Sequence, residues 1–281
     1  MSIVVTGATG HLGRLIVEAL LDRGVPADRI VALGRDTDRL AGLAARGVAT
    51  RRGDYDDPES LRAAFAGAEK LMFVSGSEVG RRVVQHGNVV TAAREAGVGL
   101  IVYTSIANAD TSSLALAAEH QATEQLIRDS GPPHVFLRNS WYLENYTGQL
   151  PTYLRHGVAG AAGDGRVSAA TRADYAAAAA SVLTAADQAG AVYELGGVPF
   201  TMTELAAEVS RQAGATVSYL DLPVDKYTEL LVAAGVPEAY AAVLADADRG
   251  ITQGELEVGD DLARLLGRTP TTLAEAIRAA L

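Results

Sequence analysis

The chain has 281 residues, 48% of them hydrophobic, so it is long enough to bury a full core in one or two domains. Its formal net charge of −10 and its lack of any basic run argue against nonspecific nucleic-acid binding, which depends on Lys and Arg neutralising phosphates. Without cysteine the chain can form no disulfide, cysteine metal site or thiolate nucleophile, which fits a reducing compartment.

No stretch of the sequence predicts a secretory signal or a membrane span. The first expected strand starts at residue 3, which leaves no room for a signal peptide. The most apolar run, residues 176–186, is rich in alanine and interrupted by Ser181 and Thr184, whereas a bilayer span takes about 20 residues. We therefore expect a soluble, cytoplasmic protein with neither a membrane nor a nucleic acid as partner.

Residues 3–13 predict a strand, a glycine turn and the start of a helix. Residues 3–5 form an apolar run typical of a strand buried on both faces of a parallel sheet. Apolar residues recur at helical spacing from Leu12 onward. Backbone N–H groups and the helix dipole at such a turn favour a pyrophosphate, and glycines let the backbone approach it closely. We therefore predict dinucleotide binding, not an ordinary β–α turn, at three glycines: Gly7, Gly10 and Gly13.

The second expected strand, residues 29–35, ends in a basic residue. In sites that prefer NAD, an acidic residue about 20 positions after the glycines commonly holds the ribose 2′-hydroxyl. Here Arg35 follows Gly13 by 22 residues (35 − 13 = 22), and an arginine can bind a 2′-phosphate through two nitrogens. We favour NADPH over NADH, while Asp36 leaves open a solvated Arg–Asp pair.

The alternation of strands and helices continues through the next segments. Asp54, at the end of a short third strand, is either an adenine ligand or the cap of a turn. The fourth strand, residues 70–74, runs into the small residues 75–79, which keep a ligand crevice open at the carboxyl edge of a doubly wound sheet. We expect residues 75–79 to lie along the ribose and nicotinamide.

A fifth strand over residues 100–105, a helix over 116–130 and a sixth strand over 134–138 come next. Residues 139–146 hold the only tryptophan and two tyrosines. This aromatic and polar cluster is either a wall for a flat substrate over the nicotinamide or a set of amphipathic aromatics at a domain seam.

Beyond residue 150 the alternation loosens. We expect a glycine-rich turn region over 157–165, strands over 192–195 and 217–220, and helices over 171–186, 203–213, 225–247 and 271–281. The predicted fold is α/β, a Rossmann doubly wound parallel sheet with a smaller, interleaved C-terminal α/β substrate lobe. We assign residues 1–150, with later segments returning to them, to the NADP-binding domain, and residues 151–281 to the lobe.

The usual catalytic residues of short-chain dehydrogenases are missing. Ser105 could be their serine, but Leu116 and His120 stand where Tyr-x-x-x-Lys would supply a proton donor. No HExxH and no helically spaced histidine pair predicts a metal, and no GxSxG predicts a hydrolase. What remains is hydride transfer to an acceptor that scarcely needs a protein acid, such as a quinone. His120 is the first candidate proton donor and Tyr142 the second, with a purely structural His120 as the alternative.

Together these motifs resemble the NmrA-like atypical short-chain dehydrogenase/reductases. More narrowly, they are similar to the bacterial flavin-free NAD(P)H:quinone oxidoreductases of that family. The resemblance spans nearly the whole chain and is carried by residues 6–13, Arg35, 75–79, 103–105, 119–120, 138–146, 162–165, 170–175 and 270–275.

The resemblance implies an enzyme that passes hydride from NADPH to small quinones in one two-electron step, without flavin or metal. The alternative within the family is a non-catalytic NADP(H) sensor that binds a protein partner, and a homodimer is left open. His11 and Gly76 depart from the glutamine and serine expected of relatives. The cofactor-binding residues so implied are Gly7, Ala8, Thr9, Gly10, His11, Leu12, Gly13, Arg35, Asp54, Ser75, Gly76, Ser77, Tyr103, Ser105, Asn139, Ser140, Trp141, Tyr142, Leu143 and Glu144.

Overall fold

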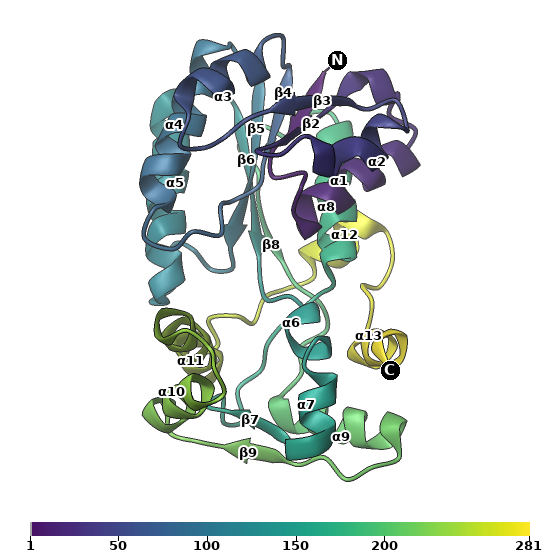
Figure 1. Cartoon of the computed structure of the whole chain (residues 1–281), viewed down its shortest axis with the longest axis vertical. Coiled ribbons are helices and arrows are strands. Elements are labelled where there is room, and N and C mark those ends of the chain that lie inside the picture. Colours follow the sequence, from purple (N-terminus) through teal and green to yellow (C-terminus); the bar gives the residue numbers. More distant parts are fainter. Residues whose placement is uncertain (1) are drawn as a thin grey trace. The chain divides into compact units, whose positions relative to one another are not determined.

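The computed structural model describes residues 2–281 (Figure 1). Its strands are β1 (Ile3–Val5), β2 (Ile30–Gly34), β3 (Ala49–Arg52), β4 (Lys70–Phe73), β5 (Leu100–Ile106), β6 (His134–Asn139), β7 (Val158–Gly160), β8 (Val192–Leu195) and β9 (Tyr219–Asp221). Its helices are α1 (His11–Asp22), α2 (Ala41–Ala44), α3 (Pro58–Phe65), α4 (Arg82–Glu95), α5 (Ala115–Ser130), α6 (Glu144–Thr147), α7 (Leu150–His156), α8 (Arg172–Thr184), α9 (Met202–Ala213), α10 (Val224–Ala233), α11 (Glu238–Thr252), α12 (Asp261–Leu266) and α13 (Leu273–Ala280). Two 3₁₀ turns cover Ala27–Arg29 and Asp38–Leu40.

The main sheet has seven strands in the order β3-β2-β1-β4-β5-β6-β8. The pairings from β3 through β5 are parallel, with Val4 of β1 opposite Val31 on one side and Leu71 on the other. The chain turns from one direction across the sheet to the other between β1 and β4, which is where doubly wound sheets bind ligands. The predicted Rossmann class is confirmed.

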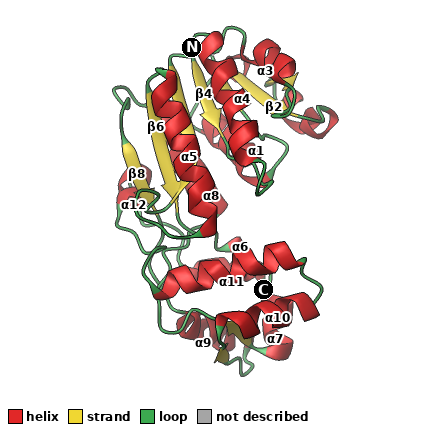
Figure 2. Ribbon diagram, turned by 90° about the vertical axis from the view of Figure 1, so that its left-hand side faces the viewer, coloured by secondary structure: helices red, strands yellow, loops and turns green. Residues whose placement is uncertain are grey.

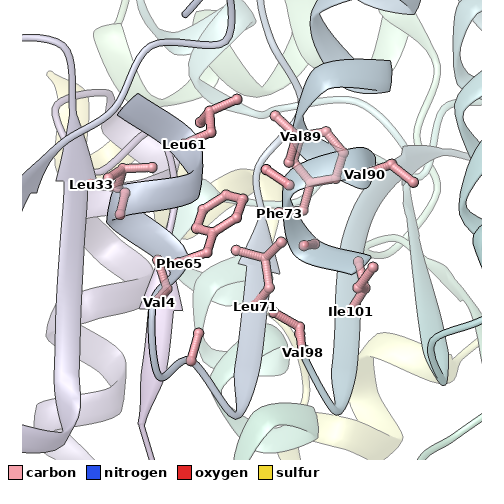
Figure 3. Close-up of a cluster of buried hydrophobic side chains, with 14 of the residues drawn as sticks. Val4, Leu33, Leu61, Phe65, Leu71, Phe73, Val89, Val90, Val98 and Ile101 are labelled. Carbon is pink, nitrogen blue, oxygen red and sulfur yellow. The ribbon is translucent and has the colours of Figure 1, made fainter. Parts of the chain in front are cut away.

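Helices α3, α4 and α5 cover one face of this sheet, and α1 and α8 pack together on the other (Figure 1). The apolar strand residues are buried because both faces are covered. Figure 3 shows the core beneath α3 and α4, where Phe65 and Phe73 lie among aliphatic side chains from β1, β2, β4 and β5. Both phenyl rings are fully buried.

The packing divides the chain into two compact units, each made of three segments. The first unit holds residues up to 106 together with 119–138 and 172–193, and the second holds 107–118, 139–171 and 194–281. Residues 172–193, beyond the boundary assigned at residue 150, therefore pack with the first unit.

The second unit contains the two-stranded parallel sheet β7–β9. Helix α9 begins with a capping box in which Thr201 and Glu204 each bind the other's backbone N–H. Helices α10 and α11 lie side by side (Figure 2). Among residues 2–281, no helix is long and apolar enough to cross a bilayer.

Several expected helices differ from the observed ones. The helical stretch expected over 225–247 is two helices, because Gly235 adopts a φ of +89° and Pro237 is the N-cap of the next helix. Residues 38–44 form a 3₁₀ turn followed by the four residues of α2. Helices α6, α7 and α12 were not predicted, because each is short and lacks an extended apolar period.

Candidate functional site

The glycine turn after β1 leaves the first turn of α1 open to an anion. Its N-cap, Gly10, has no side chain to cap the helix. Gly7 adopts a φ of +62°, and a Cβ added at Gly13 would lie 2.3 Å from the Gly7 carbonyl oxygen, so the turn requires glycine at both positions. Backbone bonds from Gly10 N–H to Gly7 O and from Ala8 N–H to Leu33 O, both 2.9 Å, fix its shape. The cradle fits the pyrophosphate of a dinucleotide.

The predicted glycine-turn residues are brought together here. Thr9 and Leu12 lie in or beside the turn, and His11 is exposed at the start of α1. The Thr9 methyl packs on β2, where a Cβ added at Gly34 would meet it at 2.4 Å. The glycine turn and the end of β2 are therefore in direct contact.

Arg35 at the end of β2 is exposed and forms an ion pair with the loop after β4. Its Nη1 lies 3.1 Å from Oε1 of Glu78. A second guanidinium, which the sequence reasoning missed, lies nearby: Nη2 of Arg39 donates to the Thr9 carbonyl at 3.2 Å. The signal for Arg39 was a second arginine four residues after Arg35. Two cations thus flank the glycine turn and suit a 2′-phosphate.

Residues of the loop after β4 are held by neighbouring side chains. Ser75 N–H donates to Thr104 Oγ1 at 2.8 Å, and Gly76 N–H donates to Nε2 of His86 at 2.9 Å. Because Nε2 accepts this bond, it carries no proton. Burial, together with the nearby Arg82 charge, lowers the pKa of His86 to about 3. The ring is therefore neutral at physiological pH, and Nε2 remains available to accept the Gly76 N–H. Ser77, two positions after Ser75, is exposed.

The loop after β3 supports the same edge of the sheet. Oδ1 of Asp54 accepts the N–H of Asp56 at 3.1 Å. Asp54 therefore caps a turn, which is one of the two roles expected for it. The hydroxyl of Tyr55 donates to the Val74 carbonyl at 2.7 Å and lies 2.5 Å from Thr6 Oγ1. Tyr55, also missed from sequence, thereby links the loops after β1, β3 and β4.

Alternate residues of β5 point to opposite faces of the sheet. Thr104 reaches Ser75, whereas Tyr103 and Ser105 reach α5. The Tyr103 hydroxyl lies 2.7 Å from Nδ1 of His120, and Ser105 Oγ donates to Oε1 of Glu124 at 2.6 Å. The side-chain hydroxyls of both predicted cofactor ligands are thus engaged between strand and helix, and their contact with cofactor stays a prediction.

His120 is buried on α5. Burial first, then the positive charge of Arg82, lowers the pKa of His120 well below its ordinary value. The expected role of His120 as the first proton donor assumed an unperturbed pKa near neutrality, whereas the buried ring has a lowered pKa. His120 is a neutral imidazole at pH 7.

Glu124 anchors a buried charge network next to His120. It accepts from Arg138 through both oxygens, with Nε–Oε1 at 2.9 Å and Nη2–Oε2 at 2.8 Å. Arg128 reaches Oε2 at 2.9 Å. Because the carboxylate also accepts from Ser105, the serine that resembles the dehydrogenase residue is fixed within the first unit.

The remaining predicted residues, 139–144, belong to the second unit and begin with the last residue of β6. Ser140 Oγ donates to the Leu256 carbonyl at 2.8 Å, and Tyr142 forms a parallel bridge with Ala170. Leu143 is buried, whereas Trp141 and Tyr142 are half-buried, and Glu144 begins α6. Oδ1 of Asn139 is buried and has no hydrogen-bond partner among the described residues, so it can accept a bond from a bound molecule.

No group of three or more metal-ligating side chains occurs within residues 2–281.

The NmrA-like family profile matches residues 1–275. The chain belongs to the NmrA-like family. It is 48% identical over 278 residues to quinone oxidoreductase 2 of Escherichia coli (strain K12), covering 98% of this chain and 97% of the relative.

Two solved structures extend this likeness to the NmrA-like fold. The crystal structure of the NADPH-dependent quinone oxidoreductase QOR2 from Escherichia coli, complexed with NADPH, matches with a TM-score of 0.96 and 46% identity over 99% of both chains. The triphenylmethane reductase of Citrobacter sp., complexed with NADP(H), matches with a TM-score of 0.95 and 41% identity over 100% of both chains.

Proposed function

We propose that this NmrA-like protein is a cytoplasmic reductase that uses NADPH to reduce small quinones by two electrons, without flavin or metal. The observation that carries the proposal is the 48% identity to quinone oxidoreductase 2 along 98% of this chain. The glycine cradle, with Gly13 too close to Gly7 O to carry a side chain, supports dinucleotide binding by this chain itself. The cation pair Arg35 and Arg39 beside the cradle supports the phosphorylated cofactor.

The proposed roles are carried over from the family resemblance, residue by residue. Residues 7–12 hold the pyrophosphate, and Arg35, joined by Arg39, holds the 2′-phosphate. Ser75–Ser77, Asn139 and residues 140–144 contact the nicotinamide and the quinone. When bound, the nicotinamide supplies the hydride. The protein lowers the barrier mainly by holding the two reactants together, which can contribute about 7–11 kcal/mol.

The proton required by the reduced quinone comes from solvent or from one of two proposed donors. His120 can donate only as a neutral imidazole, because its pKa is lowered by burial. A phenol O–H is a stronger acid than the N–H of a neutral imidazole, so we rank Tyr142 above His120 as the donor.

The test follows NADPH absorbance with p-benzoquinone in the presence and absence of the purified protein. We expect oxidation that depends on both, with one hydroquinone formed for each NADPH consumed. Arg35→Ala should weaken NADPH binding by about tenfold or more and leave NADH nearly unchanged. Tight NADPH binding without quinone-dependent oxidation would overturn the enzyme proposal and favour a non-catalytic sensor.

A further inference from the structure

We propose that Glu78 sets the cofactor preference by competing with the 2′-phosphate of NADPH for Arg35 and by accepting the 2′-hydroxyl of NADH. The proposal rests on the assignment of the 2′-phosphate to Arg35 made above. Neither the glycine motif nor the strand-end arginine indicates such a residue, because Glu78 lies in the loop after β4, 43 residues beyond Arg35.

Each oxygen of the Glu78 carboxylate has a different partner. Oε1 lies 3.1 Å from Nη1 of Arg35. Oε2 accepts from Nη1 of Arg81 and from Nε2 of Gln85, both at 3.1 Å. The carboxylate is thus held from the α4 side by Oε2 and presents Oε1 to Arg35.

The residues behind Glu78 are themselves fixed. Arg81 Nη2 lies 2.8 Å from Oδ1 of Asp56, and Gln85 Nε2 donates to Oδ2 of the same carboxylate at 3.0 Å. Gln85 is buried. Since Glu78 is anchored through this network, it stays in place when Arg35 changes partner.

Arg35 is free to change partner because 68% of its side chain is exposed. Exposed ion pairs contribute little to stability, whereas a guanidinium can bind a phosphate through two strong bonds. A guanidinium has five N–H donors, and Glu78 occupies one nitrogen. The 2′-phosphate can therefore share Arg35 with Glu78 or displace Oε1 from it, and in both cases the phosphate and the carboxylate compete for one guanidinium charge.

The consequences differ for the two cofactors. Arg35 and Arg39 bring two positive charges to the 2′-phosphate, and the carboxylate of Glu78 offsets one of them, so Glu78 opposes binding of the phosphate. A ribose 2′-hydroxyl brings no charge and can donate to the carboxylate. Because Oε1 lies 3.1 Å from Nη1, a group bound at that nitrogen is within reach of Glu78. Compared with a neutral residue at position 78, Glu78 thus weakens the binding of NADPH and strengthens the binding of NADH.

The experiment measures binding of two fragments without nicotinamide, 2′,5′-ADP and 5′-ADP, by titration calorimetry on the full chain. Glu78→Gln keeps the shape of the side chain and removes its charge. We expect this substitution to tighten the binding of 2′,5′-ADP and to weaken the binding of 5′-ADP. The ratio of the 2′,5′-ADP affinity to the 5′-ADP affinity should rise by about tenfold. NADPH and NADH fluorescence titrations should follow the same ratio. Glu95→Gln, which removes the carboxylate of an exposed pair with Arg62, is the matched control and should leave the ratio unchanged.

Arg35→Ala separates failure of this proposal from failure of the proposed function. If Arg35→Ala abolishes the preference for 2′,5′-ADP but Glu78→Gln leaves the ratio as it was, Glu78 has no role in selection. Equal changes in the affinities of both fragments in Glu78→Gln would also overturn the proposal that Glu78 selects the cofactor. If Arg35→Ala changes the affinities of both fragments by the same factor, Arg35 does not bind the 2′-phosphate. The proposal for Glu78 is then also wrong.

Discussion

The Tyr103 hydroxyl and Nδ1 of His120 lie 2.7 Å apart between β5 and α5, and both rings are buried. Burial raises the pKa of Tyr103 and lowers that of His120, so each partner is held in its neutral form. A neutral pair of this kind does not titrate in the physiological range. His120 therefore cannot act as an imidazolium acid.

The first prediction concerns the pH dependence of turnover. We expect kcat to show no inflection that belongs to His120 between pH 6 and 8, since its folded-state pKa lies well below 6.5. His120→Gln should leave the shape of the kcat profile unchanged in that range. An inflection near neutrality that disappears in His120→Gln would restore the imidazolium donor.

The second prediction concerns the buried pair Glu124 and Arg138. Glu124→Gln leaves the guanidinium buried without its counterion, so we expect the free energy of unfolding to fall by about 3–5 kcal/mol. The same substitution at Glu95, in an exposed pair with Arg62, should cost less than about 1 kcal/mol. Urea unfolding of both variants measures the difference, and equal losses would contradict it.

The third prediction concerns the glycine cradle. An alanine Cβ at position 13 would lie 2.3 Å from Gly7 O, so Gly13→Ala must distort the turn. We expect NADP⁺ binding to weaken by at least about tenfold in calorimetry. Gly87, within α4, has nothing within 4 Å of an added Cβ, and Gly87→Ala should bind normally and gain up to about 1 kcal/mol of stability. Normal binding by Gly13→Ala would remove the cradle from the site.

The fourth prediction concerns Asp248 on α11, whose Oδ2 accepts the Ala161 N–H at 2.7 Å. Burial raises the pKa of Asp248 from 3.8 to about 6. Between these values the folded state binds a proton that the unfolded state has lost, so the free energy of unfolding falls as pH rises through this window. Below the window the carboxyl is neutral in both states.

Asp248→Asn removes this titration and keeps an oxygen acceptor. Between pH 4.5 and 7.5 we expect the wild type to lose about 2 kcal/mol of stability relative to Asp248→Asn. Urea unfolding of both proteins at the two pH values provides the test. A stability difference that is independent of pH would show that Asp248 keeps its ordinary pKa.

The sequence was informative where local chemistry decides the structure. The apolar run Ile3–Val5, the glycines after it and the helical period that follows predict the first β–α unit without knowledge of the rest of the chain. The parallel sheet followed from the repetition of such units. The break between α10 and α11 is also local, because glycine and proline at positions 235 and 237 are residue types that end and begin helices.

The side-chain partners of the candidate site needed three-dimensional information. Ser105 meets Glu124 only because α5 packs on β5, and no pattern within β5 indicates that partner. The same holds for His86, which supports Gly76 from one helical face, and for Tyr55, whose hydroxyl reaches across two loops. Burial likewise altered the expected chemistry of His120, because pKa shifts depend on what surrounds a group in space.

The segments of the two units alternate along the chain, so the chain passes between the units five times. A fragment that ends at residue 150 would lack α8, and the apolar side of α1 that packs against it would face water. Neither unit can be expressed, exchanged or inherited as one uninterrupted stretch of gene. Exchanging one unit with that of a relative would mean replacing three separate stretches of the chain at once.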